Sequence, residues 1–195
     1  MTIVLEKEAE DFLEKNKFSV INRTFIKKKS QIKEVKLKFP WVMKVYSKSI
    51  IHKHKHGGII LGIKNYKQAE LAFTKLSKLK GFQGTVIQEI IFGQELILGL
   101  KSTKDFGLTI LLGAGGTDVE KKKDITFRVL PITKHDAKQM TEDISAKIKN
   151  KPEIIKNLLR LNNLGLKHKN IKELDINPII LNKTHAKIVD ARIIK

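Results

Sequence analysis

The sequence predicts an α+β protein of two lobes, and three features of the chain support that prediction. Segments with helical spacing of apolar residues alternate with short runs of β-branched residues, as in mixed folds. From Thr85 onward, runs of residues with high strand propensity follow one another closely. We find no internal repeat and no low-complexity linker. We therefore expect an N-terminal lobe over residues 1–85 and a C-terminal lobe over residues 86–195.

In the N-terminal lobe, apolar spacing and cap residues define the predicted elements. Pro40 stops one helix, because proline disfavours helical backbone at the residue before it. Asn65 caps another, and Gly81 ends it. The expected elements are helix 5–16, strand 18–26, helix 31–39, a strand beginning at Trp41, strand 59–63 and helix 66–80.

In the C-terminal lobe, strands dominate and two helices are marked by their first residues. Thr133 is expected to cap a helix that has Asp136 at its third position, which favours both the cap and the helix dipole. Pro152 opens the last helix after Asn150, and Gly165 is expected to end it. The expected strands are 85–91, 95–100, 106–112, 126–130, 173–181 and 186–194.

Composition limits the class of protein. The chain has 195 residues, 41% of them hydrophobic, which is enough for a packed core. It has no apolar run of membrane-spanning length, no cysteine, and acidic residues where a secretion signal would be basic, so we expect a cytoplasmic protein. The net charge of +19 can indicate a nucleic-acid partner, but the lysines are spread along the chain, and arginines and aromatic residues are few. Nucleic acid is therefore the weaker alternative.

The stretch from Trp41 to Gly58 is the first candidate for chemistry. It begins as a strand with Lys44 among apolar residues, and a buried lysine is costly unless its ammonium reaches an anion or water. A histidine-bearing loop then closes on Gly57 and Gly58, which can let a backbone approach phosphate oxygens. The pattern suits a polyphosphate site, although an edge strand with a solvated lysine fits it equally well.

The closing hairpin is a candidate metal site. Alternation places Glu173, Asp175 and Asn177 on one face, and Asp190 lies in the apolar strand that follows. Oxygen ligands suit Mg²⁺, which keeps waters and nucleotide phosphates as its other ligands. A solvated polar face is the alternative.

Four weaker candidates lie between these two stretches. Residues 88–91 can offer backbone groups to a base, and Glu95 can accept hydrogen bonds from ribose hydroxyls. Gly115 and Gly116, in a glycine-rich turn, can wrap phosphate, although the turn has neither P-loop nor dinucleotide-binding spacing. Arg128 is either a phosphate clamp or a rim charge.

The alternating histidines His52, His54 and His56 could share a face and bind zinc or copper. The lysines between them disfavour a divalent cation, so a metal is not expected there.

Taken together, these stretches resemble the ATP-grasp beta subunit of ADP-forming acyl-CoA synthetases (ADP-forming acetate–CoA ligases), which are related to the succinyl-CoA synthetase beta subunit. The stretches follow one another in the order of that family and cover nearly the whole chain. They are Val42–Lys44 with His52-Lys53 and Gly57-Gly58, Val86–Glu89, Gly93–Glu95, Gly113–Gly116 with Val119-Glu120, Asp124–Arg128, Glu173–Pro178 and Val189–Arg192.

The resemblance implies an ATP-grasp fold, with two α+β lobes enclosing the nucleotide. It implies a ligase that carries out acyl-CoA + ADP + phosphate ⇌ acid + ATP + CoA, with ATP/ADP and Mg²⁺. It also implies a partner, a CoA-binding alpha subunit that bears a phosphohistidine, in a heterotetramer. The beta subunit passes the phosphoryl group to ADP.

By the same resemblance, individual residues take roles. Lys44 would contact nucleotide phosphates, Glu95 would hold ribose, and His52 would relay the phosphoryl group as a neutral imidazole nucleophile. The residues expected at adenine are Gln88, Glu89, Ile90 and Ile91, and those expected at Mg²⁺ are Asn177 and Asp190.

The sequence departs from the family in the histidine loop. The family reads His-Lys-Ser-Asp-Val/Ile-Gly-Gly, whereas this chain reads His-Lys-His-Lys-His-Gly-Gly over residues 52–58, so Lys55 replaces an acid. Asp118 also replaces a large apolar residue. These changes leave a non-catalytic ATP-grasp paralogue as an alternative.

Overall fold

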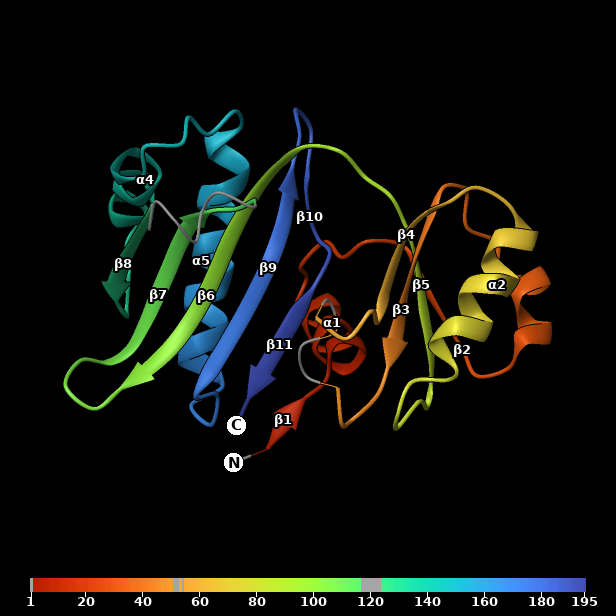
Figure 1. Ribbon diagram of the computed structural model, residues 1–195. Helices are drawn as coiled ribbons and strands as arrows, with labels where there is room; N and C mark the ends of the chain where they lie inside the picture. Colours follow the sequence, from red (N-terminus) through yellow and green to blue (C-terminus); the bar gives the residue numbers. More distant parts are fainter. Residues whose placement is uncertain (1, 51–52, 54, 117–123) are drawn as a thin grey trace. The chain divides into compact units, whose positions relative to one another are not determined.

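The computed structural model describes residues 2–50, 53, 55–116 and 124–195. The chain forms two compact units: unit 1 combines Met1–Val20 with Phe92–Lys195, and unit 2 is Ile21–Ile91. Figure 1 shows the elements of each. Within the described ranges, no helix is both long and apolar enough to span a bilayer.

Unit 1 is built on a seven-stranded antiparallel sheet in the order β1-β11-β9-β6-β7-β8, with β10 also paired to β9. Its strands are β1 (Ile3–Val4), β6 (Gln94–Thr103), β7 (Gly107–Ala114), β8 (Ile125–Val129), β9 (Glu173–Leu181), β10 (Ala186–Ile188) and β11 (Ala191–Ile194). Its helices are α1 (Glu6–Lys15), α4 (Lys134–Asp143) and α5 (Lys151–Lys167). In Figure 1, α5 lies behind β6 and β7, and α4 lies beside β8.

The core of unit 1 follows from alternation along β6. Leu96, Leu98 and Leu100 are buried beneath the helices, so Glu95 and Gly99 lie on the opposite face of the sheet. Gly165 is part of this packing, because a Cβ there would come within 2.9 Å of Leu108 and Leu130. The prediction that Gly165 ends the last helix is therefore wrong: α5 continues to Lys167, and the glycine allows close helix–sheet contact.

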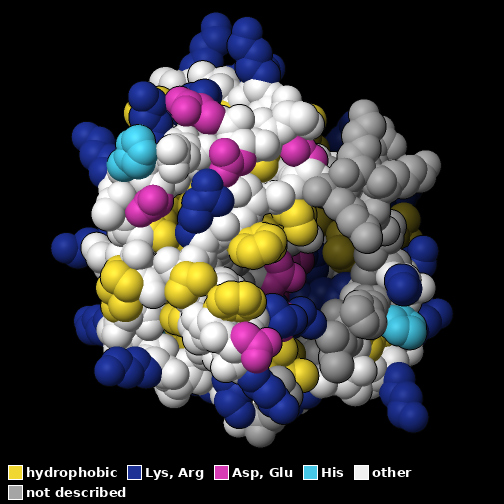
Figure 2. Space-filling model, turned by 90° about the vertical axis from the view of Figure 1, so that its left-hand side faces the viewer, with side chains coloured by type: hydrophobic (Ala, Val, Ile, Leu, Met, Phe, Trp, Pro, Cys, Tyr) yellow, Lys and Arg dark blue, Asp and Glu magenta, His cyan; other side chains and the backbone are white. Residues whose placement is uncertain are grey.

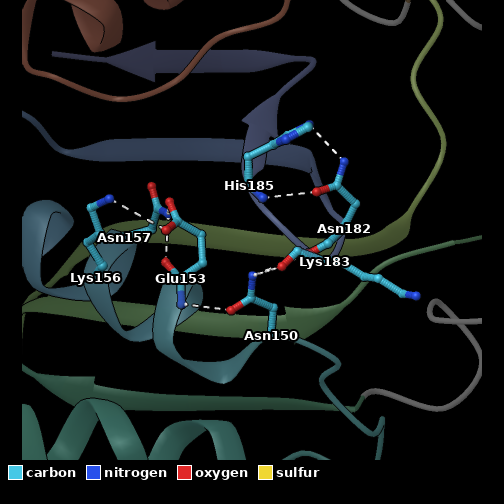
Figure 3. Close-up of polar contacts among 7 residues, drawn as sticks. All are labelled: Asn150, Glu153, Lys156, Asn157, Asn182, Lys183 and His185. Atoms are coloured by element: carbon cyan, nitrogen blue, oxygen red, sulfur yellow. Dashed lines mark hydrogen bonds and ion pairs between the residues drawn. The ribbon is translucent and has the colours of Figure 1, made fainter.

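The cap predicted at Thr133 is confirmed, and the last helix begins after Asn150 as expected. The Thr133 hydroxyl accepts from the Asp136 N–H at 3.2 Å, and the Thr133 N–H donates to the Asp136 carboxylate at 2.7 Å. Asn150 caps α5, and its amide also donates to the carbonyls of Asn182 and Lys183 at 3.3 and 3.0 Å. Figure 3 shows this amide joining the start of α5 to the β9–β10 turn.

Unit 2 is a four-stranded antiparallel sheet in the order β2-β5-β3-β4. Its elements are β2 (Arg23–Ile26), the 3-10 helix η1 (Lys29–Glu34), β3 (Trp41–Tyr46), β4 (Ile59–Ile63), α2 (Tyr66–Leu76) and β5 (Gly84–Glu89). One face is packed in a core that contains Trp41, Met43 and Val45 of β3 together with residues of α2 and η1.

Two predictions about unit 2 elements are wrong. The strand expected over 18–26 is confined to β2, and the helix expected over 31–39 is only the short η1. The chain leaves η1 at Val35, whose backbone is extended, and the Leu37 carbonyl accepts a hydrogen bond from the buried Trp41 indole at 3.2 Å.

The division into units also differs from the expected lobes. Residues 2–20 group with the C-terminal part because β1 pairs with β11 and α1 packs on β11. Residues 86–91 group with the N-terminal part because β5 pairs with β2 and β3. Long-range strand pairing decides both cases.

Candidate functional site

Lys44 is buried in the sheet of unit 2, with 4% of its surface exposed. It lies between Ile59 of β4 and Val86 of β5. Because Met43 and Val45 face the core, Lys44 faces the opposite side of the sheet. Gln88, 1% exposed, pairs with Val42 and therefore shares that side. The structure thus brings Lys44 and Gln88 onto one face of unit 2.

Gly57 and Gly58 close the loop beside this strand. Gly57 has φ +64°, in the left-handed region that favours glycine. A Cβ on Gly58 would lie 2.6 Å from Val45, and the Gly58 carbonyl accepts from the Val45 N–H at 2.7 Å. The Gly58 N–H donates to the Lys53 carbonyl at 2.8 Å, so this amide already has a partner within the loop. The Gly57–Gly58 pair therefore holds the loop against Val45, the residue that follows Lys44.

The end of β5 is held by contacts within unit 2. The Asn22 amide donates to the Glu89 carboxylate at 2.9 Å, and the Glu89 N–H donates to the Asn22 carbonyl at 3.3 Å. The Ile90 N–H donates to the Pro40 carbonyl at 3.3 Å. Ile90 and Ile91 are half-buried. Asn22 was not expected in this role, since no local pattern links it to a residue so distant in sequence.

In unit 1, Glu95 and the glycine turn lie together. The Gly115 N–H donates to the Glu95 carbonyl at 2.8 Å, and a Cβ on Gly115 would lie 2.7 Å from the same carbonyl carbon. A Cβ on Gly116 would lie 3.9 Å from a Glu95 carboxylate oxygen. Glu95 is exposed, so its carboxylate can meet a ligand. The absence of side chains at the turn is what allows this approach.

Asn177 and Asp190 are neighbours across the closing strands. The Asn177 N–H donates to the Asp190 carbonyl at 3.1 Å, and the Val189 N–H donates to the Pro178 carbonyl at 3.1 Å. The β9–β6 register shifts between Leu96 and Leu98, opposite this position. The single strand expected over 186–194 is accordingly split into β10 and β11.

The two side chains suit a hard cation. An amide oxygen and a carboxylate are ligands that Mg²⁺ accepts, and Mg²⁺ usually has only one or two protein carboxylates. Asn177 is exposed and Asp190 is half-buried, so water and phosphate oxygens can reach a cation there. Among the described residues there is no group of three or more His, Cys, Asp or Glu that could hold a metal.

Glu173 and Asp175, which share the expected face with Asn177, are balanced by cations. Arg192 and Lys101 pair with the Glu173 carboxylate at 2.8 and 3.1 Å. Burial raises the pKa of the Asp175 carboxyl and Glu173 adds to the rise, whereas Arg192 and Lys101 oppose it. The repulsion that suggested a metal at these two acids is therefore relieved by the protein itself.

Arg128 lies on the helix side of the sheet. Its guanidinium pairs with Asp143 of α4 at 2.5 Å and donates to the Thr126 hydroxyl at 3.0 Å. Hydrogen bonds from Arg128 and Thr126 hold the pKa of the Asp143 carboxyl below its ordinary value. In the β7–β8 register, Arg128 lies opposite the buried Ile110, so both side chains are on the same face of the sheet. That face is the one opposite to Glu95. The structure does not bring Arg128 together with Glu95.

His52 and His54 lie outside the described residues, as do Asp118, Val119 and Glu120. Figure 2 shows one face of the molecule, on which Lys and Arg side chains are scattered among acidic, apolar and neutral ones. That distribution does not favour a nucleic-acid surface on this face.

The chain belongs to the ATP-grasp family: the model of the ATP-grasp domain matches residues 1–194. Among its relatives is the acetate–CoA ligase [ADP-forming] II of Archaeoglobus fulgidus, 32% identical over 98% of this chain and 30% of that protein. The beta subunit of acetate–CoA ligase [ADP-forming] I of Pyrococcus furiosus is 36% identical over 80% of this chain and 75% of that subunit. The chain thus spans about a third of the length of the Archaeoglobus fulgidus relative.

Solved structures agree with this assignment. The dinucleotide-forming acetyl-coenzyme A synthetase 1 of Ca. Korarchaeum cryptofilum, in complex with coenzyme A and Ca-AMPCP, superposes with a TM-score of 0.91 at 29% identity, covering 98% of this chain and 93% of that one. Another structure of that enzyme, with Mg-AMPPCP, has a phosphohistidine segment pointing towards the nucleotide-binding site, with a TM-score of 0.84, 30% identity, and 98% and 92% coverage. The prediction of an ATP-grasp fold is confirmed.

Proposed function

We propose that this chain is the nucleotide-binding beta component of an ADP-forming acyl-CoA synthetase. In the proposed reaction it transfers a phosphoryl group between a phosphohistidine on a companion CoA-binding polypeptide and ADP. The phosphorus–nitrogen bond breaks as a bond forms to the terminal ADP oxygen, and the overall change is acyl-CoA + ADP + phosphate ⇌ acid + ATP + CoA.

The observation that carries the proposal is the backbone hydrogen bond between Asn177 and Asp190. It puts one amide residue and one carboxylate residue at neighbouring positions. Mg²⁺ bound there would neutralise phosphate charge. Phosphoryl transfer needs mainly positioning and charge neutralisation, so a chain with few conventional catalytic groups can suffice.

The remaining site residues would position the nucleotide. The Lys44 ammonium would lie against phosphate oxygens, with Gln88 on the same sheet face. Glu95, held by Gly115, would accept hydrogen bonds from ribose hydroxyls. The Gly57–Gly58 turn would keep the loop beside Lys44 in place, and Gly116 would leave room for phosphate. Residues 88–91 would contact the base. His52 would relay the phosphoryl group.

Two findings support a companion polypeptide. The matched region is only 30% of the Archaeoglobus fulgidus ligase, so most of that protein lies outside the part that resembles this chain. The Korarchaeum structures contain coenzyme A and a phosphohistidine segment besides the nucleotide analogue. We propose a CoA-binding, phosphohistidine-bearing alpha subunit as the companion, in a heterotetramer in the cytoplasm.

Two measurements test this function. ATP formation from acetyl-CoA, ADP and phosphate is expected with the companion subunit and not without it. In titration calorimetry, Asp190→Asn is expected to weaken Mg-ADP binding strongly, whereas Asp105→Asn, in the exposed β6–β7 turn, should not. Unchanged Mg-ADP affinity in Asp190→Asn would remove the metal assignment. Nucleotide binding without any ATP formation would instead favour the non-catalytic paralogue.

A further inference from the structure

A groove of about 580 Å³ lies along the outer side of α5, near the start of α4. Its lining combines an apolar floor with cations. The apolar residues are Pro152, Ile155 and Leu159, and the cations are Lys134, Lys156 and Arg160.

The groove follows one face of α5. Its α5 residues, from Pro152 to Asn163, recur at intervals of one, three or four positions, which places them on one side of the helix. At about 1.5 Å per residue, this face runs for about 16 Å, or three turns. The opposite face of α5, which includes Ile154, Leu158 and Leu161, is buried. Ile155 and Leu159 are only half-buried, so the floor keeps apolar surface exposed.

The cations of the groove are incompletely neutralised. Lys156 pairs with Glu153 at 3.5 Å, an exposed contact visible in Figure 3. Among the residues that the structure describes, no acidic side chain pairs with Lys134 or Arg160. An exposed apolar floor beside unneutralised cations is complementary to a ligand that is both apolar and acidic.

We propose that this groove binds an acidic amphipathic helix from another polypeptide. A helix of about three turns matches the length of the groove, with an apolar residue every third or fourth position on the floor and carboxylates against the cations. The net charge of +19 would draw such a segment towards the protein at long range. A nucleic acid is disfavoured because the floor has no aromatic residue on which bases could stack.

The groove is also separate from the candidate nucleotide residues of unit 1. Glu95 and Gly99 lie on the face of the sheet opposite α5, whereas the groove lies on the side of α5 that is not buried. Binding in the groove can therefore be tested without nucleotide.

The test uses a fluorescein-labelled synthetic helix of about 16 residues with Leu at heptad spacing and flanking Glu, measured by fluorescence anisotropy at physiological salt. A peptide of the same composition in scrambled order is the control. The patterned peptide should bind at least about tenfold more tightly, because one charge-assisted contact of about 1.4 kcal/mol corresponds to that factor. Absence of binding, or equal binding of the scrambled peptide, overturns the proposal.

Variants locate the binding. Arg160→Glu and Lys134→Glu should each weaken it about tenfold or more, and Lys134→Glu should fold because a carboxylate is favourable in the first turn of α4. Lys138→Glu makes the same charge change at an exposed position of α4 outside the groove and should leave affinity within about twofold. Equal losses in all three would mean general attraction to a basic protein. Vesicles of phosphatidylglycerol, or poly-uridine RNA, that displaced the peptide at equal charge would also refute the proposal.

Discussion

Gly115→Ala is expected to disturb nucleotide binding through Glu95. The added Cβ would lie 2.7 Å from the Glu95 carbonyl carbon and 2.8 Å from its Cβ, so the backbone of one strand must shift. Such overpacking costs about 1–3 kcal/mol of stability. The shift also lengthens the 2.8 Å hydrogen bond between the Gly115 N–H and the Glu95 carbonyl. If Glu95 then loses a charge-assisted bond to ribose, worth about 1.5–3 kcal/mol, the Kd for Mg-ADP should rise about 10- to 150-fold.

The matched control is Gly107→Ala. Gly107 has φ +70° and a Cβ there would meet nothing within 4 Å, so the substitution costs about 1–2 kcal/mol through backbone conformation alone. It lies opposite Thr103, at the other end of the β6–β7 pair from Glu95. Urea unfolding should show that both variants are destabilised, whereas calorimetry should show weaker Mg-ADP binding only for Gly115→Ala. Normal binding by Gly115→Ala, or equal loss in Gly107→Ala, would refute the proposed role of Glu95.

Three further substitutions test other residues. Lys44→Met should weaken Mg-ADP binding by about 1.5–3 kcal/mol in calorimetry, with thermal stability unchanged or raised because a buried ammonium is removed; lost stability with normal binding would make Lys44 structural. Asp143→Asn should lower the free energy of unfolding at neutral pH, and the difference from wild type should vanish as pH falls below 3.8, because the stability from a lowered carboxyl pKa is lost when that carboxyl protonates; a pH-independent difference in urea titrations would contradict this. His52→Ala should abolish ATP formation while leaving ADP binding intact, whereas His56→Ala should do much less; full ATP yield from His52→Ala would remove the relay role.

Local sequence signals predicted the parts of the fold that depend on neighbouring residues. The cap at Thr133 and the start of α5 after Asn150 depend on side chains within a few positions, and both predictions are confirmed. The predicted bounds of β4, residues 59–63, are confirmed as well. The short η1 and the split of β10 from β11 depend instead on distant contacts. After η1, the Trp41 indole donates a hydrogen bond to the Leu37 carbonyl. The break between β10 and β11 lies beside Asn177, where the register of β9 with β6 shifts.

The candidate site shows the same division. Lys44 could be singled out because a lysine in an apolar strand is unusual, and it is indeed buried. The partner of Arg128 could not be predicted, since Asp143 lies in a separate helix and no spacing rule connects the two. The counterions of Glu173 come likewise from β6 and β11. Charge pairing across strands and helices needs the tertiary structure.

The position of Arg128 changes how its role should be tested. Asp143 and Thr126 already satisfy much of its guanidinium, and the pair joins α4 to β8. If Arg128 served only as a phosphate clamp, Asp143→Asn would leave the clamp charge in place and reduce stability alone. If it instead acts by holding α4, the stability lost in Asp143→Asn should be matched in Arg128→Ala, and neither should alter Mg-ADP affinity. The structure favours the second outcome, because Arg128 and Glu95 lie on opposite faces of the same sheet.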